Sequence, residues 1–324
     1  MKIKLSTALI VGVSAAAFAA SAAAEEVTLR GVSSFAKATA FSRAWEDFVE
    51  YVNQNGKGVL QINYIGGPEA VPPFEVGNAV QSGVVDIANV TSAYYTNLIP
   101  ESDALHLATT TIQEQRENGC YDLINVMHEE KINAHYLART GDNVPFHLYL
   151  TKPIDKPDLS GLTIRTTPVY QAFFAALGAN LVRTAPGEVY TALERGSIDG
   201  YGWPIQGVLD LGWHERTKYR VDPGFYQVDV NFLVNLAAWN KLDDAQRALL
   251  EEAAARTEEK NAENKQVNEE ERRRQAEAGI ETIAFAGADQ EKWLQSAQDE
   301  GWKSVAQVDQ AAAEKLRACL SPAS

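Results

Sequence analysis

The sequence predicts an α/β fold of two domains that are bridged by one long helix, and three observations lead to it. Along residues 26–237, short segments that are apolar or that alternate apolar and polar residues are separated by helical segments. This strand–helix–strand order is typical of a parallel sheet. Residues 243–278 contain neither proline nor glycine, which predicts a helix of roughly 54 Å. Removing an N-terminal leader of 24 residues leaves 300 residues, a length that suits two domains.

Residues 1–24 have the pattern of a secretory signal peptide. Lys2 and Lys4 precede an apolar run at 5–20, and small residues at 22–24 predict cleavage near Ala24. A membrane anchor is the alternative, but the run is short and rich in alanine for a span that needs about 20 residues. We therefore expect an exported protein.

The charge of the chain excludes some partners. The formal net charge is −14, and removing Lys2 and Lys4 gives −14 − 2 = −16. Such an acidic surface argues against nucleic acid or an anionic membrane as a partner. Two cysteines, Cys120 and Cys319, can form a disulfide in an oxidising compartment or remain two buried thiols, and their spacing does not decide between these.

The first α/β block begins at residue 26, and its elements follow from apolar periodicity. They are strands at 26–33, 59–65 and 84–90, a helix that contains Phe41–Val52 and stops at Gly56 and Gly58, a helical segment near 74–82, a helix at 112–130, and strands at 132–138 and 145–150.

A crossover with two prolines at 152–157 leads to the second block. Its two strand–helix units comprise a strand at 162–165, helices at 168–177 and 187–195, and a closing strand at 198–201. An apolar run at 225–237 could pass from one block to the other, and a helical segment at 293–319 ends the chain. We expect domain I to comprise 25–148 plus 232–279, and domain II to comprise 149–231 plus 280–324.

The common enzyme motifs are missing from the sequence. The five histidines form no HExxH or HxH spacing, and neither a GxSxG elbow nor a GxxxxGK[ST] phosphate loop occurs. We predict no catalytic residues, no cofactor and no metal.

Arg165 is the strongest candidate for a binding residue. It ends an apolar strand just before a Thr-Thr-Pro helix start, at the edge where open α/β sheets bind ligands. Arginine stays charged when buried and can grip a carboxylate with two hydrogen bonds. The alternative is an internal salt bridge to an aspartate or glutamate.

Other candidates also follow predicted strands. Trp203, within Gly-Tyr-Gly-Trp-Pro, offers a flat apolar wall with one N–H donor, and core packing is its alternative role. Phe35 follows the first strand, Thr91 and Tyr94 follow the strand at 84–90, and Glu69 begins a helix after Gly-Gly-Pro. Each of these could instead be an ordinary loop residue, and Glu69 could simply favour a helix dipole.

Several of these segments resemble the substrate-binding proteins of tripartite ATP-independent periplasmic (TRAP) transporters, the DctP-like family. The similar segments are GLTIRTTP, GEVYTALERGSIDGYGWP, GGPEAVPPFE with VVDIANVTSAYY, and the long charged helix after AAWNKLDDAQRALLEEAA. The resemblance covers nearly all of the mature chain. It implies the two-domain fold of a type II-like periplasmic binding protein, located in the periplasm, in which a small organic acid binds between the domains and the domains close.

The resemblance also implies roles for individual residues. Arg165 takes the place of the arginine that grips the ligand's carboxylate, and Trp203 stands where many members have asparagine. A second arginine of some members is replaced near Phe146, and Gly202 stands where cation-assisted members carry a carboxylate. These departures point to a ligand with one carboxylate, such as a keto, hydroxy or aromatic acid, and to no metal.

We therefore expect a receptor, not an enzyme, that captures an organic acid anion and delivers it to the membrane permease subunits of a TRAP transporter. It would act as a monomer or a homodimer. The alternatives are an exported enzyme with Glu69 or a histidine as base, and a sensory binding protein that presents its closed form to a receptor.

Overall fold

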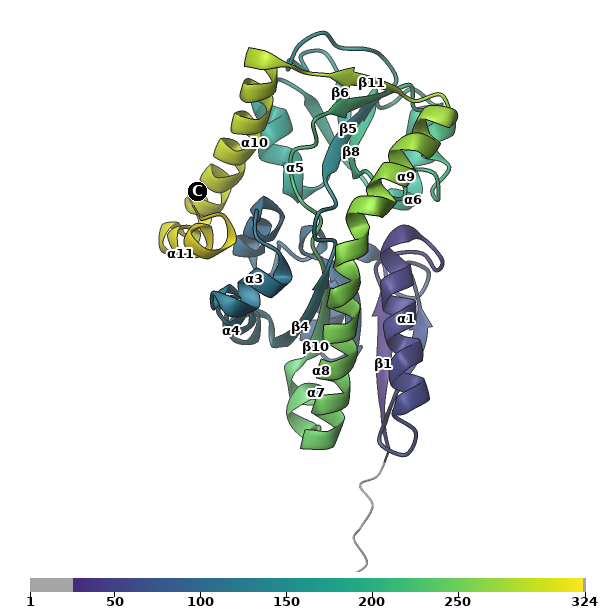
Figure 1. Cartoon of the computed structure of the whole chain (residues 1–324), viewed down its shortest axis with the longest axis vertical. Helices are drawn as coiled ribbons and strands as arrows, with labels where there is room; N and C mark the ends of the chain where they lie inside the picture. The colour runs from purple at the N-terminus through teal and green to yellow at the C-terminus, as the bar shows by residue number, and fades with distance from the viewer. Residues whose placement is uncertain (1–25, 323–324) are drawn as a thin grey trace, which may run out of the picture.

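The computed structural model describes residues 26–322, and it is an elongated molecule with one β-sheet in each half (Figure 1). We call the half with the five-stranded sheet the first lobe and the half with the six-stranded sheet the second lobe. The signal peptide predicted at 1–24 lies outside the described residues. Within 26–322 no helix is both long enough and apolar enough to cross a bilayer.

The first sheet has the strand order β2-β1-β3-β10-β4. Its strands are β1 (Val27–Ser33), β2 (Leu60–Gly66), β3 (Ile87–Thr91), β4 (Ala134–Thr140) and β10 (Val230–Asn235). β1 is parallel to β2 and β3, whereas β10 is antiparallel to β3 and β4. The carboxyl ends of β1 and β3 therefore meet at one edge of the sheet, as the sequence predicts.

Helices cover both faces of this sheet. The predicted amphipathic helix is confirmed as α1 (Ala40–Asn55), which buries Trp45, Phe48, Val49 and Val52 and ends at Gly56. The other helices of the lobe are α2 (Val76–Gln81), α3 (Ile112–Glu117), α4 (Cys120–Ile132) and α7 (Leu236–Lys241), with the short 3-10 helices η1 (Pro73–Glu75), η2 (Ser92–Tyr94) and η3 (Pro100–Leu107).

The second sheet has the order β11-β9-β5-β8-β6-β7. Its strands are β5 (Phe146–Leu150), β6 (Thr163–Thr166), β7 (Asn180–Arg183), β8 (Gly200–Pro204), β9 (Tyr219–Asp222) and β11 (Glu281–Ala284). The two predicted strand–helix units are present, because α5 (Pro168–Ala176) follows β6 and α6 (Pro186–Glu194) follows β7. Each helix starts with a proline, where the missing N–H costs nothing. β6 is parallel to β7 and β8.

A helical column runs along both lobes (Figure 1). It is not the single helix predicted at 243–278: a 3-10 turn, η5 (Lys260–Glu263), separates α8 (Asp244–Glu259) from α9 (Asn264–Glu277). Asparagines in and after this turn bond to the backbone at the end of β4 and in the segment that leads from β4 to β5. Asn261 Nδ2 donates to the carbonyl of Arg139, and Asn268 Nδ2 donates to that of Asn143. The polar middle of the column thus holds the crossing between the lobes.

Two other predicted elements are interrupted. The helix predicted at 112–130 breaks before α4 because Gly119 adopts a φ of +81°, a conformation that few residues other than glycine tolerate. The apolar run at 225–237 is a strand only over β10, because 225–229 form the connection from the second lobe and α7 follows at once. The short strands β9 and β11 have no counterpart among the elements predicted from sequence.

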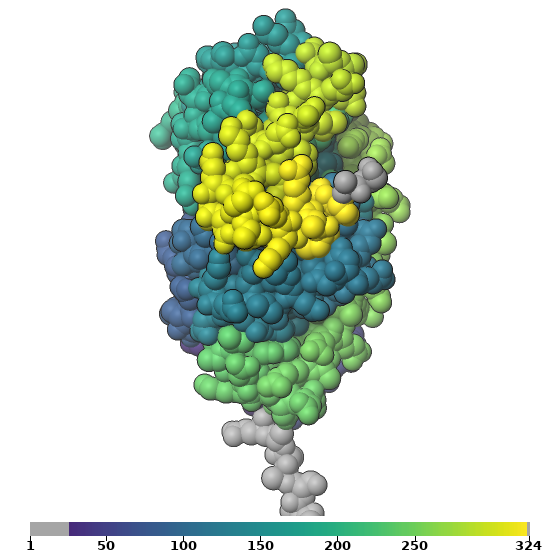
Figure 2. All heavy atoms as spheres, turned by 90° about the vertical axis from the view of Figure 1, so that its left-hand side faces the viewer, coloured from purple at the N-terminus to yellow at the C-terminus, as the bar shows by residue number. Residues whose placement is uncertain are grey.

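The C-terminal helices contact elements of both lobes. α10 (Gly287–Val308) packs against both α5 and η3, and α11 (Gln310–Leu320) packs against η3 and α4, so the end of the chain returns to the first lobe. Figure 2 shows this segment, in yellow, lying across the junction of the lobes. A disulfide between Cys120 and Cys319 joins α11 to α4. β5 belongs wholly to the second sheet.

Candidate functional site

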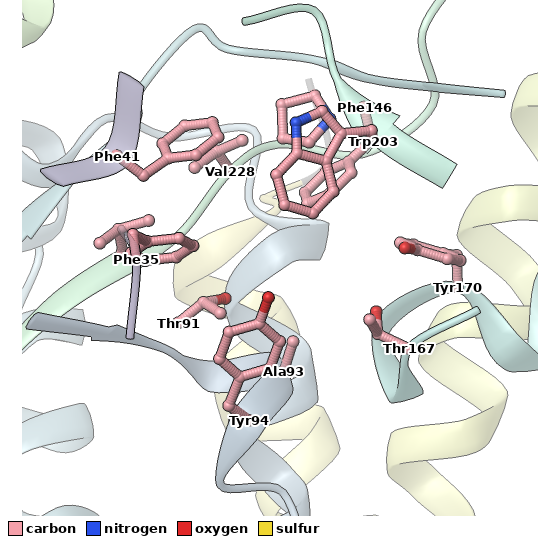
Figure 3. Close-up of a pocket in the computed structure, with 12 residues that line it drawn as sticks. Phe35, Phe41, Thr91, Ala93, Tyr94, Phe146, Thr167, Tyr170, Trp203 and Val228 are labelled. Atoms are coloured by element: carbon pink, nitrogen blue, oxygen red, sulfur yellow. The ribbon is translucent and has the colours of Figure 1, made fainter. Parts of the chain in front are cut away.

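A cavity of about 30 Å³ lies between the carboxyl edge of the first sheet and the strands β5 and β8 of the second (Figure 3). Half of its lining residues are aromatic. It comprises Phe35, Phe41, Thr91, Ala93, Tyr94 and Val230 from the first lobe, Phe146, Thr167, Tyr170, Trp203 and Pro204 from the second, and Val228 from the connection between them.

Arg165 lies behind this lining with no part of its side chain exposed. Its Nε and Nη2 donate to the carbonyl oxygen of Thr184 at 3.1 and 2.8 Å, and its Nη1 donates to the hydroxyl of Tyr170 at 2.8 Å. The guanidinium carbon lies 5.7 Å from the ring centre of Trp203. The cation therefore touches two residues of the cavity wall, and three of its five N–H groups have a protein acceptor.

Comparison with the other buried arginines shows what is unusual about Arg165. Arg139 pairs with Asp142, and Arg220 pairs with Asp222 at 2.9 Å. Within residues 26–322, by contrast, no carboxylate lies within 4.0 Å of the Arg165 guanidinium, whose acceptors are a carbonyl and a hydroxyl. The internal salt bridge considered for Arg165 is thus not formed. A buried cation with only neutral acceptors favours the arrival of an anion.

Tyr170 couples the arginine to strand β8. Its hydroxyl accepts from Arg165 and donates to the carbonyl oxygen of Gly202 at 2.7 Å. A Cβ at position 202 would lie 2.7 Å from the Tyr170 ring, so glycine is needed for this approach. The ring occupies the space into which any side chain at position 202 would extend.

The hydroxyls of Thr91, Tyr94 and Thr167 point toward the cavity (Figure 3). Burial raises the pKa of Tyr94 to about 12, even though the charge of Arg165 acts in the opposite direction, so Tyr94 is a neutral donor at neutral pH. Asp229 fixes the turn that carries Thr91 and Tyr94, because its Oδ2 accepts from the backbone N–H of Ser92 at 2.9 Å. Burial raises the pKa of Asp229 to about 6.

Trp203 closes the cavity from above in Figure 3. Its ring centre lies 6.2 Å from that of Phe41, on the first lobe, and 4.7 Å from that of Trp213, on the second. Its Nε1 is buried and has no acceptor among residues 26–322, and a Cβ on Gly207 would lie 3.3 Å from it. Trp203 therefore belongs to the second lobe, contacts aromatic rings of both lobes, and has one hydrogen-bond donor available to a ligand.

Most of the residues predicted from sequence meet at this cavity. Phe35, Thr91, Tyr94, Phe146 and Trp203 line it, and Arg165 contacts its wall.

Glu69 is not among the lining residues. Its Oε1 accepts from the backbone N–H of Gly67 at 2.7 Å, and backbone hydrogen bonds at Gly67 and at Glu69 itself hold the pKa of its carboxyl below the ordinary value.

Sequence reasoning missed seven lining residues of different origin. They are Phe41, Ala93, Thr167, Tyr170, Pro204, Val228 and Val230. Thr167 and Tyr170 could have been found from their place at the start of the helix after Arg165, because the first turn of that helix faces the same edge of the sheet. Nothing in the sequence pattern marks Val228.

Comparisons with known proteins agree with this architecture. The model of the family described as bacterial extracellular solute-binding protein, family 7 (DctP), matches residues 33–307. The chain is 30% identical over 213 residues to the monocarboxylate 2-oxoacid-binding periplasmic protein of Nostoc sp., a match that covers 61% of this chain and 57% of that protein. The aligned part thus spans less than two thirds of that relative.

Solved structures share the fold at low identity. An extracytoplasmic solute receptor of Bordetella pertussis that binds pyroglutamic acid has a TM-score of 0.81 at 18% identity, covering 91% of this chain and 99% of its own. A TRAP periplasmic solute-binding protein of Roseobacter denitrificans with bound L-galactonate has a TM-score of 0.78 at 21% identity, covering 90% and 99%. Since the family model matches most of the chain, this protein belongs to the DctP family of bacterial extracellular solute-binding proteins.

Proposed function

We propose that this protein is the periplasmic substrate-binding component of a TRAP transporter. It captures a small organic acid with one carboxylate, such as a keto, hydroxy or aromatic acid, as the two lobes close, and it delivers the acid to membrane permease subunits. The observation that carries this proposal is the buried, uncompensated charge of Arg165 behind a cavity between the lobes.

The chemistry of the cavity supports a ligand that has one carboxylate and few other polar groups. Arg165 has two N–H groups beyond those that bond to Thr184 and Tyr170, enough for the two oxygens of one carboxylate. The hydroxyls of Thr91 and Tyr94 can donate to an oxo or hydroxy group nearby, while the rest of the lining is largely aromatic or aliphatic. The relatives named above bind acids: a monocarboxylate 2-oxoacid, pyroglutamic acid and L-galactonate.

A thermal-shift screen of small organic acids tests the proposal directly, because a ligand that binds only the native state raises its unfolding temperature. Calorimetry on the strongest binder then compares the wild type with Arg165→Ala. Removing one partner of a buried ion pair costs about 3–5 kcal/mol, so we expect affinity to fall at least a hundredfold while circular dichroism stays unchanged.

Arg30→Ala is the matched control, because Arg30 is an exposed arginine paired with Asp86 within the first lobe. It should leave affinity unchanged. If Arg165→Ala bound the acid as tightly as the wild type, or if the purified protein converted the acid to a product, the proposal would be wrong.

A further inference from the structure

A second chamber of about 270 Å³ adjoins the cavity between the lobes. Three aromatic rings line both spaces, those of Phe35, Phe41 and Trp203. The first lobe closes the chamber with Pro68 and Pro73, and the second with residues 185–187 and Leu211. None of the described residues that line this chamber carries a charge.

The two spaces differ in what they can hold. The cavity of about 30 Å³ next to Arg165 has room for about two water-sized groups, since one water needs roughly 10–15 Å³ by this measure. An acid whose carboxylate reaches Arg165 must therefore extend the rest of its carbon skeleton elsewhere. An apolar cavity of about 150 Å³ takes up benzene, so the chamber is large enough for a tail of that size.

Hydrogen bonding argues against a polyhydroxylated tail. The hydroxyl of Thr39 already donates to the carbonyl of Ala36 at 2.6 Å. Ser34 Oγ and Trp203 Nε1 are the buried polar side-chain atoms of the described wall that have no partner. A tail with one acceptor oxygen can satisfy them, but the several hydroxyls of a sugar acid would lose their water partners at a cost of about 1–3 kcal/mol each.

We propose that this chamber holds the apolar tail of the captured acid, so that the ligand is a monocarboxylate with an alkyl or aryl group at least about the size of a benzene ring. The carboxylate lies at Arg165, and the tail extends along the rings of Phe35, Phe41 and Trp203, which line both spaces. This inference rests on the proposed function, because it assumes that Arg165 receives the carboxylate.

Affinity should then depend on chain length. Calorimetry with 2-oxobutanoate, 2-oxohexanoate and 2-oxooctanoate should show the dissociation constant falling about fourfold for each added methylene, the value for complete burial of a CH₂ group. L-Galactonate should bind no more tightly than 2-oxobutanoate.

Filling the chamber should remove this dependence. Gly187 lies in the first turn of α6, and a Cβ there meets no atom within 4 Å. Gly187→Phe should weaken 2-oxooctanoate at least tenfold and leave 2-oxobutanoate unchanged. Thr191→Phe, on an exposed position of α6 that does not line the chamber, should change neither.

A second variant tests the same wall in case the phenylalanine introduced at position 187 points into solvent instead of into the chamber. Leu211→Gln places a polar group of similar size in the wall and should weaken 2-oxooctanoate, but not 2-oxobutanoate. Equal affinity for all three acids in the wild type would overturn this inference and leave the proposed function standing. If none of the acids bound, and none in the wider screen did, the proposed function itself would fail.

Discussion

Tyr170 shows how a single hydroxyl can prepare a charged side chain for its ligand. It accepts from Arg165 Nη1 and donates to Gly202, which fixes the guanidinium against the end of strand β8 before a ligand arrives. A fixed donor loses less conformational entropy on binding, and this lowers the free-energy cost of capture.

Tyr170→Phe should therefore weaken binding while keeping the ring that packs over Gly202. It leaves one N–H of Arg165 and one buried carbonyl without a partner, at about 1–2 kcal/mol, so we expect a five- to thirtyfold higher dissociation constant by calorimetry. Tyr190→Phe is the control, since Tyr190 bonds to Glu215 on the exposed surface. Equal affinities of wild type and Tyr170→Phe would show that Arg165 does not depend on this hydroxyl.

The residues that could be predicted from sequence share one property. They lie in strands or just after them: Phe35, Thr91, Tyr94, Arg165 and Trp203. The carboxyl ends of parallel strands lie at the same edge of a sheet, so such residues come together whatever the exact packing of the sheets. Phe41 could not be assigned in the same way, because it belongs to a helix whose first turn reaches the cavity only through the packing of the two lobes. Glu69 follows a turn instead of a strand and bonds within that turn.

At the scale of elements, the N-terminus of α1 forms a contact between the lobes. Asp210, on the second lobe, accepts from the backbone N–H of Ala40 at 2.8 Å and from Nη2 of Arg43 at 3.1 Å. Asp210 thus meets both the unpaired N–H groups and the positive end of the α1 dipole. Near the cavity a further contact joins the lobes, in which Arg183 lies 4.4 Å from the ring centre of Phe74.

Because the Asp210 contact exists only when the lobes are together, losing it should weaken ligand binding without destabilising either lobe. Asp210→Asn removes the charge of a half-exposed pair, worth about 0.3–1 kcal/mol, so we expect the dissociation constant to rise two- to fivefold and the dissociation rate to rise with it. Surface plasmon resonance or stopped-flow fluorescence of the tryptophans would measure both.

The chain offers a closely matched control within one lobe. Asp86 is as exposed as Asp210, at 17% of its side chain, and it likewise accepts from a backbone N–H and from an arginine, both of Arg30. Asp86→Asn should leave ligand kinetics unchanged. If both variants behaved like the wild type, the α1 contact would not contribute to the closed state.

Element boundaries were predictable only where the signal is local. The capping box of Asp243 and Gln246 marks the start of the helical column, and Gly279 follows its end. The turn at η5 has no such marker, because it contains neither proline nor glycine. The asparagines that bond the crossing segment show their role only in three dimensions. β9 and β11 are four-residue strands that pair with each other at the edge of the second sheet, so their strand character comes from their partners.

At the scale of the whole molecule, the two lobes are linked by two segments that connect strands and by two groups of helices. The chain crosses from β4 to β5 and from β9 to β10, and the α8-η5-α9 column and the α10–α11 segment also reach both lobes (Figures 1 and 2). Hinge motion must therefore be absorbed near the 3-10 turn of the column and the short crossing segments. The sequence predicted the column and one crossing. It could not predict the contacts of α10 and α11, because helical periodicity does not show which surface a helix packs against.

The disulfide adds a covalent link between that C-terminal segment and the first lobe, which the segment also contacts through η3 and α4. Cys120 is buried in α4, and its link to Cys319 closes a loop in which the two residues are 199 positions apart. A cross-link over so long a loop removes much conformational entropy from the unfolded chain. By contrast, neither cysteine lines the cavity or the apolar chamber, so the bond should matter for stability and not for ligand contacts.

Replacing both cysteines, as Cys120→Ala with Cys319→Ala, should lower the free energy of unfolding by about 3–5 kcal/mol, measured by urea denaturation. Reduced wild-type protein serves as the comparison, because it keeps both side-chain volumes and loses only the cross-link. If the reduced protein is destabilised as much as the double variant, the loss comes from the unfolded chain. If it instead unfolds at the same urea concentration as the oxidised protein, α11 is held by packing against η3 and α4 alone. In either case ligand affinity at low urea should match the wild type, since the lobes and the Arg165 site do not depend on this link for their geometry.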